Sequence, residues 1–302
     1  MRCSSCGDEA VTFQEYSGKH LCSRHFCNDI GAKAKHAIRL HRWLRPGDHI
    51  GVAMSDDRRS RALMFFLHTL FSPRRDIRIT AIIIDEGTPG SGRTGGSCRY
   101  AETLGIPVIQ VSSRDFFGFP LEEVVGTTEL ELRGPLRTYR SILLDAVAKE
   151  HGITKIATPD SLDDEALAVL MSVMSGEPEE ILAASPNLPR KTLPLIHPFI
   201  AVSDDDIDRY AILCGTDCVS SSLPASPPVN GMGFSASIRT MMDDYTRRHP
   251  ATKYSLMHFG ENIRGAGIDC GKILSTCARC GDPFYVTCER CRIAEERSGH
   301  VA

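Results

Sequence analysis

The sequence has no long hydrophobic run and no large excess of one charge. Among its 302 residues, no apolar stretch approaches the roughly 18 residues of a membrane span. The first residues, MRCSSCGDEA, lack the apolar segment of a signal peptide. We therefore expect a cytoplasmic protein without a membrane partner. The formal net charge of −3 excludes a uniformly basic nucleic-acid coat, so any nucleic-acid surface must be local.

Cysteine, by contrast, is abundant, and eight of the 12 cysteines lie near the two ends of the chain. In a reducing compartment, paired cysteines indicate metal sites rather than disulfides. Two knuckles near the N-terminus, one CxxC and one CxxH, supply the expected zinc ligands Cys3, Cys6, Cys22 and His25. Cys27 could replace His25 as the fourth ligand.

A double CxxC motif lies near the C-terminus. Its expected zinc ligands are Cys277, Cys280, Cys288 and Cys291. Four such ligands close a tetrahedral site, so we expect two structural zinc ions, neither with an open position for catalysis. Modules this small cannot bury enough surface alone and fold on the metal.

Between these ends, strand-like and helix-like segments alternate. We expect strands at 49–55, 76–87, 106–113 and 153–161. We expect helices at 97–105, 136–152 and 162–176, and a further helix that follows the first strand and ends at about residue 71. This alternation predicts an α/β fold with a parallel sheet. Further on we expect an extended surface segment over 185–198, a helix over 203–215 and a loop over 220–235. The last part, over 236–263, should be helical on either side of Pro250.

The domain organisation follows from these patterns. We expect an N-terminal zinc finger over residues 1–30, an α/β domain with a helical tail over 31–265, and a C-terminal zinc finger over 266–302.

Several segments together resemble the TtuA-like tRNA 2-thiouridine synthetases, which are PP-loop adenylating enzymes. They are LCSRHF, IIIDEG, RTYRSILLDAVAKEHGITKIAT, SLDDEALAVLMSVMSG, LPRKTLPLIHP and the closing double CxxC. The resemblance covers nearly the whole chain and implies a PP-loop domain of the adenine nucleotide alpha hydrolase type, flanked by zinc fingers. It also implies tRNA as the partner, ATP activation of a uridine at its C2 oxygen, and displacement of the adenylate by sulfur. A homodimer and a ubiquitin-like sulfur carrier are further implied partners.

The chain departs from the family at the phosphate loop. The family sequence S-G-G-x-D-S is replaced by SDDRRS over residues 55–60, which keeps both serines and loses the glycines. Glycines let a backbone approach a pyrophosphate closely, and two carboxylates repel phosphate at short range. ATP and Mg²⁺ binding is therefore disfavoured. The residues of this degenerate ATP site are Ser55, Ser60, Asp85, Asp163 and Asp164.

Two alternatives stay open at that site. Asp163 and Asp164 are the intact half of a family G-H-N-x-D-D motif, but acids also favour the first turn of a helix. Asp85 and Glu86 end a strand at the edge where α/β folds bind ligands, yet they could simply be solvated there.

The sulfur-handling motif also differs. The family's CxxC precedes Gly134, at the positions of Leu130 and Arg133 here. The nearest match to the third family cysteine is Cys218, a candidate catalytic residue, with Cys214 a weaker one. We therefore regard an iron–sulfur cluster as unlikely.

The N-terminal segment carries a local positive charge. Residues 1–47 hold eight Lys and Arg against four acids, a local net charge of +4, which suits contact with RNA phosphates. A solvated face without a partner is the alternative. We hypothesise a tRNA-binding homologue, acting alone or with an active thiolase paralogue, that has lost ordinary adenylation and sulfur transfer. The rivals are a working thiolase with an unusual ATP loop, or a PP-loop protein with another substrate.

Overall fold

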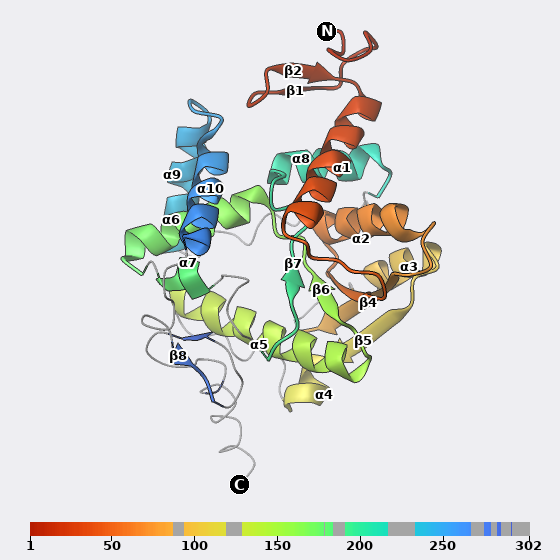
Figure 1. Ribbon diagram of the computed structural model, residues 1–302, viewed down its shortest axis with the longest axis vertical. Helices are drawn as coiled ribbons and strands as arrows, with labels where there is room; N and C mark the ends of the chain where they lie inside the picture. Colours follow the sequence, from red (N-terminus) through yellow and green to blue (C-terminus); the bar gives the residue numbers. More distant parts are fainter. Residues whose placement is uncertain are drawn as a thin grey trace.

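The fold is taken from a computed structural model (Figure 1). It describes residues 1–86, 94–118, 129–177, 179–183, 191–216, 233–266, 275–278, 283–284 and 291. For residues 94, 129–137, 275–276 and 283–284, only the backbone is described.

A five-stranded parallel sheet forms the centre of the α/β domain. Its strand order is β5-β4-β3-β6-β7. The bounds are β3 His49–Met54, β4 Arg78–Asp85, β5 Val108–Ser112, β6 Lys155–Ala157 and β7 Leu195–Ile196. All neighbouring strands run parallel. The predicted fold class, a parallel-sheet α/β domain, is therefore confirmed.

Helices cover both faces of this sheet (Figure 1). The helices are α1 Ser23–Leu40, α2 Arg58–Phe71, α3 Thr94–Thr103, α4 Ser113–Phe117, α5 Glu129–Glu150 and α8 Asp204–Leu213. Alternate residues of β4 belong to opposite cores, because Ile83 packs with the core of α1, α2 and α8 while Ile82 packs with that of α5. With both faces covered, β3 is buried along almost its whole length.

A helical lobe stands beside the sheet (Figure 1). It consists of α6 Leu162–Ser175, α7 Glu179–Ala183, α9 Phe234–Thr246 and α10 Thr252–Gly265. Helices α9 and α10 lie on either side of Pro250, as predicted. Gly260 permits the close approach of α10 to α6, because a Cβ atom there would lie 2.7 Å from Val169 Cγ2.

The N-terminal module is an antiparallel hairpin of β1 Thr12–Gln14 and β2 Lys19–Leu21 that leads directly into α1. At the other end of the chain, β8 Ser275–Thr276 pairs with β9 Pro283–Phe284. Most of the predicted C-terminal finger lies outside the described residues, so the domain boundaries stay a prediction.

Two elements differ from the sequence prediction. The segment 185–198 was expected to be extended on the surface, but Leu195 and Ile196 form the fifth strand of the sheet. Two residues near Pro194 and Pro198 carry too little pattern to be recognised as a strand. Helix α5 begins at Glu129, before the Gly134–Pro135 pair that was taken to precede it.

Among the residues that the structure describes, no helix combines the length and apolar character needed to cross a membrane. The cytoplasmic location stays a prediction.

The close contact at Gly260 generates a stability prediction. Gly260→Ala should lower the free energy of unfolding by about 1–3 kcal/mol, because the added methyl meets the stiff side chain of Val169. Gly31→Ala in α1 is the matched control, since a Cβ there has no neighbour within 4 Å. It should raise stability by about 0.5–1 kcal/mol. Urea denaturation measures both, and equal effects of the two variants would contradict the packing argument.

Candidate functional site: the turn after the central strand

The turn between β3 and α2 contains the SDDRRS segment, the predicted counterpart of the phosphate loop. Asp57 is the N-cap of α2, and its carboxylate accepts a hydrogen bond from the Ser60 backbone N–H at 2.7 Å. Ser55 Oγ donates to the same carboxylate at 2.5 Å. The buried Ser60 hydroxyl donates to the carbonyl of Ser55 at 2.6 Å. Both retained serines are therefore bonded within the turn itself.

Asp56 occupies the start of a second helix, α3. Its Oδ1 accepts hydrogen bonds from the Ser97 backbone N–H at 2.8 Å and from Ser97 Oγ at 2.5 Å. The guanidinium of Arg61 lies 3.6 Å from the same oxygen. Asp56 therefore joins two helix N-termini that are separated by about 40 positions in the sequence.

These contacts reverse the usual role of the turn. The first turn of a helix carries unpaired N–H groups and a partial positive charge, which together bind anions. Here the bound anions are the protein's own carboxylates. A phosphate arriving there would have to displace them, and two unit charges 4 Å apart repel by about 4 kcal/mol at an effective dielectric constant of 20.

The intact half of the second motif lies at the start of α6. Ser161 and Asp164 form a capping box, in which each side chain bonds the backbone of the other. Arg59, from the altered turn, donates to Asp164 at 2.8 Å and to Asp204 of α8 at 3.0 Å. Arg239 of α9 contacts the same two carboxylates at 3.2 and 3.4 Å. The two altered motifs thus meet in one charge network.

Asp163 is 5% exposed and belongs to a neighbouring part of that network. It accepts from the Asp204 backbone N–H at 3.0 Å and pairs with Lys253 of α10. Lys253 also contacts Asp243 at 2.7 Å. Burial alone would lower the pKa of Lys253, but its hydrogen bonds to Asp163 and Asp243 raise that pKa, so the ammonium stays charged.

The acids at the end of β4 complete the predicted ATP site. Asp85 is the last residue of β4, opposite Ser112 of β5. Glu86 receives both branches of the Arg140 guanidinium from α5, with Nη2 at 2.7 Å from Oε2. The sequence left ligand binding and simple solvation open for this strand end. The structure shows a third feature, an ion pair between Glu86 and Arg140.

The predicted N-terminal ligands converge on one point. One ligand atom from each of Cys3, Cys6, Cys22 and His25 lies within 4.8 Å of all the others. Cys22 Sγ is 3.3 Å from His25 Nδ1 and 3.7 Å from Cys6 Sγ. A tetrahedral zinc site with Zn–S bonds of about 2.3 Å separates neighbouring ligands by about 3.8 Å. The cluster therefore has the donor set and spacing of a structural metal site.

Helix α1 sets the choice of the fourth ligand. Cys22 is its N-cap and His25 lies in its first turn, so both face the hairpin. Cys27, the alternative ligand, lies outside the cluster, and its Sγ is 3.8 Å from Cys214 Sγ of α8. The geometry therefore favours His25.

The remaining predicted residues are described only in part. Cys277 and Cys291 of the C-terminal set approach each other to 3.4 Å between their Sγ atoms. Cys280, Cys288 and the candidate Cys218 lie outside the described residues. Leu130 and Arg133 lie in α5, where only the backbone is described.

Sequence reasoning missed the partners of the altered motifs. They are Ser97, Asp204, Arg239 and Lys253. Each lies tens of residues from the motif it contacts, and no local pattern marks it. Only the acidic start of the helix at 203–215 gave a signal, and that signal indicated a cap rather than a charge network.

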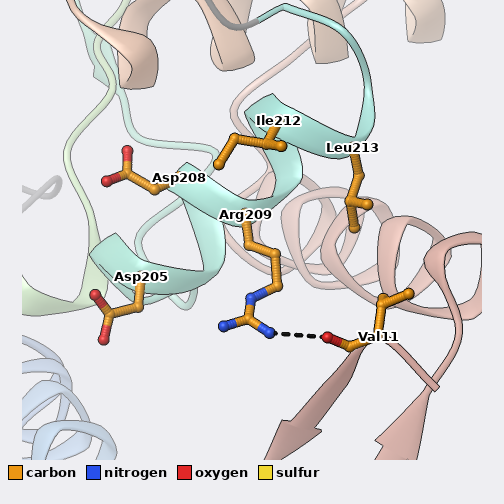
Figure 2. A pocket seen from close by; sticks show the side chains of 6 residues that line it. All are labelled: Val11, Asp205, Asp208, Arg209, Ile212 and Leu213. Carbon is orange, nitrogen blue, oxygen red and sulfur yellow. Dashed lines mark hydrogen bonds between the residues drawn. The ribbon is translucent and has the colours of Figure 1, made fainter.

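A separate cavity of about 530 Å³ lies between the hairpin and α8. It is lined by Val11, Asp205, Asp208, Arg209, Ile212 and Leu213 (Figure 2). Arg209 points to the carbonyl of Val11 and donates to it at 3.2 Å. The lining contains none of the altered motif residues.

Comparison with known proteins supports the reading of the fold and the finger. The model of the N-terminal LIM domain of 2-thiouridine synthetase TtuA matches residues 2–27. The tRNA 2-thiolation protein NcsA of Haloferax volcanii is 27% identical over 98% of this chain and 98% of its own. The tRNA-5-methyluridine(54) 2-sulfurtransferase of Thermus thermophilus is 25% identical over 97% of this chain and 91% of its own.

A solved structure has the same fold. The U34-tRNA thiolase NcsA of Methanococcus maripaludis superposes with a TM-score of 0.81 at 22% identity, covering 98% of this chain and 96% of the other. The chain therefore has the parallel-sheet α/β fold of that thiolase, preceded by an N-terminal finger with a cluster of metal-ligand residues. Along almost its whole length it is similar to TtuA- and NcsA-like tRNA 2-thiolation proteins.

One cofactor expectation is wrong. An iron–sulfur cluster was considered unlikely, but the similar thiolase of Methanococcus maripaludis contains a [4Fe-4S] cluster. The expectation rested on Leu130 and Arg133 standing at two positions of one local motif. Cluster ligands are cysteines gathered in space by the fold, so counting cysteines in one short motif is not a sound basis for excluding a cluster.

The finger geometry generates a metal prediction. His25→Ala should lower the zinc content of the purified protein by about one equivalent per chain, because a ligand of the cluster is lost. Cys27→Ser is the matched control, since Cys27 stands outside the cluster, and it should keep the full metal content. Elemental analysis by mass spectrometry measures both. Metal loss in Cys27→Ser with retention in His25→Ala would reverse the ligand assignment.

Proposed function

We propose that this protein is a zinc-containing, tRNA-binding homologue of the 2-thiolation enzymes that does not bind ATP as they do. Its role would be that of a non-catalytic or altered tRNA-modification factor. The observation that carries the proposal is the occupation of two helix N-termini by Asp57 and Asp56.

The energetic cost of ATP binding at this turn supports the proposal. Losing an N-cap hydrogen bond costs about 1 kcal/mol, and here two carboxylates would have to leave their N–H partners. They would stay close to the arriving phosphates and repel them. The glycines of the family loop impose neither cost, because they have no side chain.

The arginines of the turn do not offset this repulsion. Arg59 is committed to Asp164 and Asp204, and Arg61 lies beside Asp56. Arg58 lies 3.9 Å from Asp208. Because each guanidinium already faces a carboxylate, its charge is largely balanced within the protein.

The exposed side of α1 supports tRNA as the partner. Arg24, Lys35 and Arg39 are all exposed. Lys35 and Arg39 follow Arg24 by about three and four helical turns, so the three side chains share one face of α1. We call these three residues the α1 basic face. The single acid of α1, Asp29, is already engaged by Lys33 at 3.2 Å. An uncompensated row of cations suits the phosphates of RNA.

Other partners remain part of the proposal. A homodimer, an active thiolase paralogue and a ubiquitin-like sulfur carrier are the assemblies that the family resemblance suggests. Of these, the active thiolase paralogue could supply the ATP chemistry that this chain's own turn disfavours.

A second candidate is an active ATP-dependent tRNA uridine 2-sulfurtransferase with an atypical ATP loop. It is favoured by similarity along almost the whole length of the tRNA 2-thiolation protein of Haloferax volcanii. Measurement of 2-thiouridine in a deletion strain separates the two. Loss of the modification that wild-type protein restores and Ser55→Ala does not would support the second candidate.

The carboxylate occupation predicts weak ATP binding. Isothermal titration calorimetry with MgATP should give a dissociation constant above about 1 mM for the wild-type protein. This corresponds to a binding free energy of about −4 kcal/mol or weaker. The double variant Asp56→Gly/Asp57→Gly should bind at least about tenfold more tightly, because the two repelling charges are gone. Asp76→Gly, which removes an exposed acid paired with Arg74, is the control and should change nothing. Micromolar affinity in the wild-type protein would overturn the proposal.

The α1 basic face predicts where RNA binds. Lys35→Glu/Arg39→Glu should weaken tRNA binding at least about tenfold and reduce the slope of log affinity against log salt by about 1–2. Arg247→Glu/Arg248→Glu, an equally exposed pair after α9, is the matched control. Filter binding across a salt series measures both. An equal loss in the two variants would assign the effect to net charge rather than to α1.

A further inference from the structure

Two thiols that the metal cluster does not use lie in contact. Cys27 is in the second turn of α1, and Cys214 is the C-cap of α8. Their Sγ atoms are 3.8 Å apart, although the residues are 187 positions apart in the sequence. Both side chains are partly exposed, so a small reagent can reach them.

The surrounding packing holds the two thiols in place. Helices α1 and α8 share one core, in which Phe26 and Ile30 pack with Ile207 and Ala211. A second connection, from Arg209 to the carbonyl of Val11, joins α8 to the hairpin (Figure 2). Because both cysteines stand on well-packed helices, side-chain rotation is the motion left to bring the sulfur atoms together.

A metal does not account for this pair. Within the described part of the chain, the finger is the one group of three or more candidate ligands in mutual reach, and neither Cys27 nor Cys214 belongs to it. Two thiolates alone do not close a tetrahedral zinc site. The two sulfur atoms instead share a hydrogen bond, in which Cys214 Sγ donates to Cys27 Sγ at 3.8 Å.

We propose that Cys27 and Cys214 form a reversible disulfide by exchange with a low-molecular-weight disulfide. One cysteine attacks a sulfur of the reagent, forms a mixed disulfide and releases the first reagent thiol. The second cysteine then attacks the mixed disulfide at the protein sulfur and releases the second reagent thiol. The two protons lost by the cysteines end on the two released thiols, and the reagent disulfide is the species reduced.

The bond requires little movement. A disulfide has an S–S distance of about 2.05 Å, so the sulfur atoms must approach by about 2 Å from their separation of 3.8 Å. Cytosolic disulfides of this kind are usually transient and respond to the redox state. The reaction goes beyond the proposed function and does not depend on it.

The disulfide would fix the finger to the rest of the molecule. Helix α1 carries the last two ligands of the metal cluster at its start and the α1 basic face on its exposed side. Helix α8 begins at Asp204, which pairs with Arg59 next to the altered turn and with Arg239 of α9. Oxidation therefore ties α1 covalently to α8, the helix that carries Asp204 of the charge network, and reduction releases it.

The test uses the reduced, metal-loaded full-length protein and oxidised glutathione as the probe. After alkylation of free thiols, peptide mapping should find Cys27 linked to Cys214 in most chains, and dithiothreitol should reverse it. The melting temperature should rise by at least about 5 °C on oxidation, because a long loop is closed. The metal content should stay constant. Recovery of both cysteines alkylated, or linkage of either to a finger cysteine, would overturn the proposal.

Variants keep the test independent of folding. Cys27→Ser and Cys214→Ser should each abolish the linkage and the temperature shift, and each should leave the other cysteine open to a mixed disulfide with glutathione. Cys98→Ser, which removes another partly exposed thiol, is the matched control and should oxidise like the wild-type protein. Loss of a metal equivalent in Cys27→Ser or Cys214→Ser would instead make the pair part of a metal site and overturn the proposal.

Discussion

The carboxylates of Asp57 and Asp56 accept hydrogen bonds from backbone N–H groups in the first turns of α2 and α3, and the arrangement of the surrounding charges depends on these bonds. A parallel sheet brings the N-termini of its crossover helices to one edge, and their unpaired N–H groups need an anionic or polar partner. In this chain the anionic partners are side chains of the protein itself, Asp57 and Asp56. The turn is thus complete without a ligand, which a glycine-rich turn cannot be.

The same substitutions create the link between distant elements. Because carboxylates bond the helix N-termini, Arg59 has no phosphate to bind there and pairs with Asp164 and Asp204 instead. Arg239 and Lys253 add cations from α9 and α10. Five helices, α2, α6, α8, α9 and α10, therefore meet through ion pairs near the edge of the sheet. Partly buried networks of this kind act together, so removing one member leaves its partner's charge uncompensated.

The finger depends on a different constraint. Its hairpin is too small to bury a core of its own, and its ligands come from a turn, a strand end and the start of α1. A metal held by these four residues would fix the start of α1 against the hairpin. Because α1 also packs on α8 through Phe26 and Ile30, the position of the finger is transmitted to the charge network by direct contact.

Much of the fold could be predicted from the sequence. The strands at 49–55 and 76–87 are long apolar runs, and the helix at 162–176 has a capping signal, so their type and approximate bounds were recognisable. The strand at Leu195–Ile196 was not, since two residues between prolines have no period. The expectation against an iron–sulfur cluster failed for a related reason: a local motif is a poor measure of which residues a fold brings together.

The sequence by itself predicted the four ligands of the finger and determined that acids stand in the turn after the first long strand, because both depend on residue type at short spacing. Tertiary structure alone decided what the altered residues do. Asp56 bonds Ser97, Asp163 pairs with Lys253, and Cys27 meets Cys214. Each of these pairs is separated by about 40 to 190 positions. Hydrogen bonds and ion pairs act over a few ångströms, so their partners are set by how the helices pack and not by order along the chain.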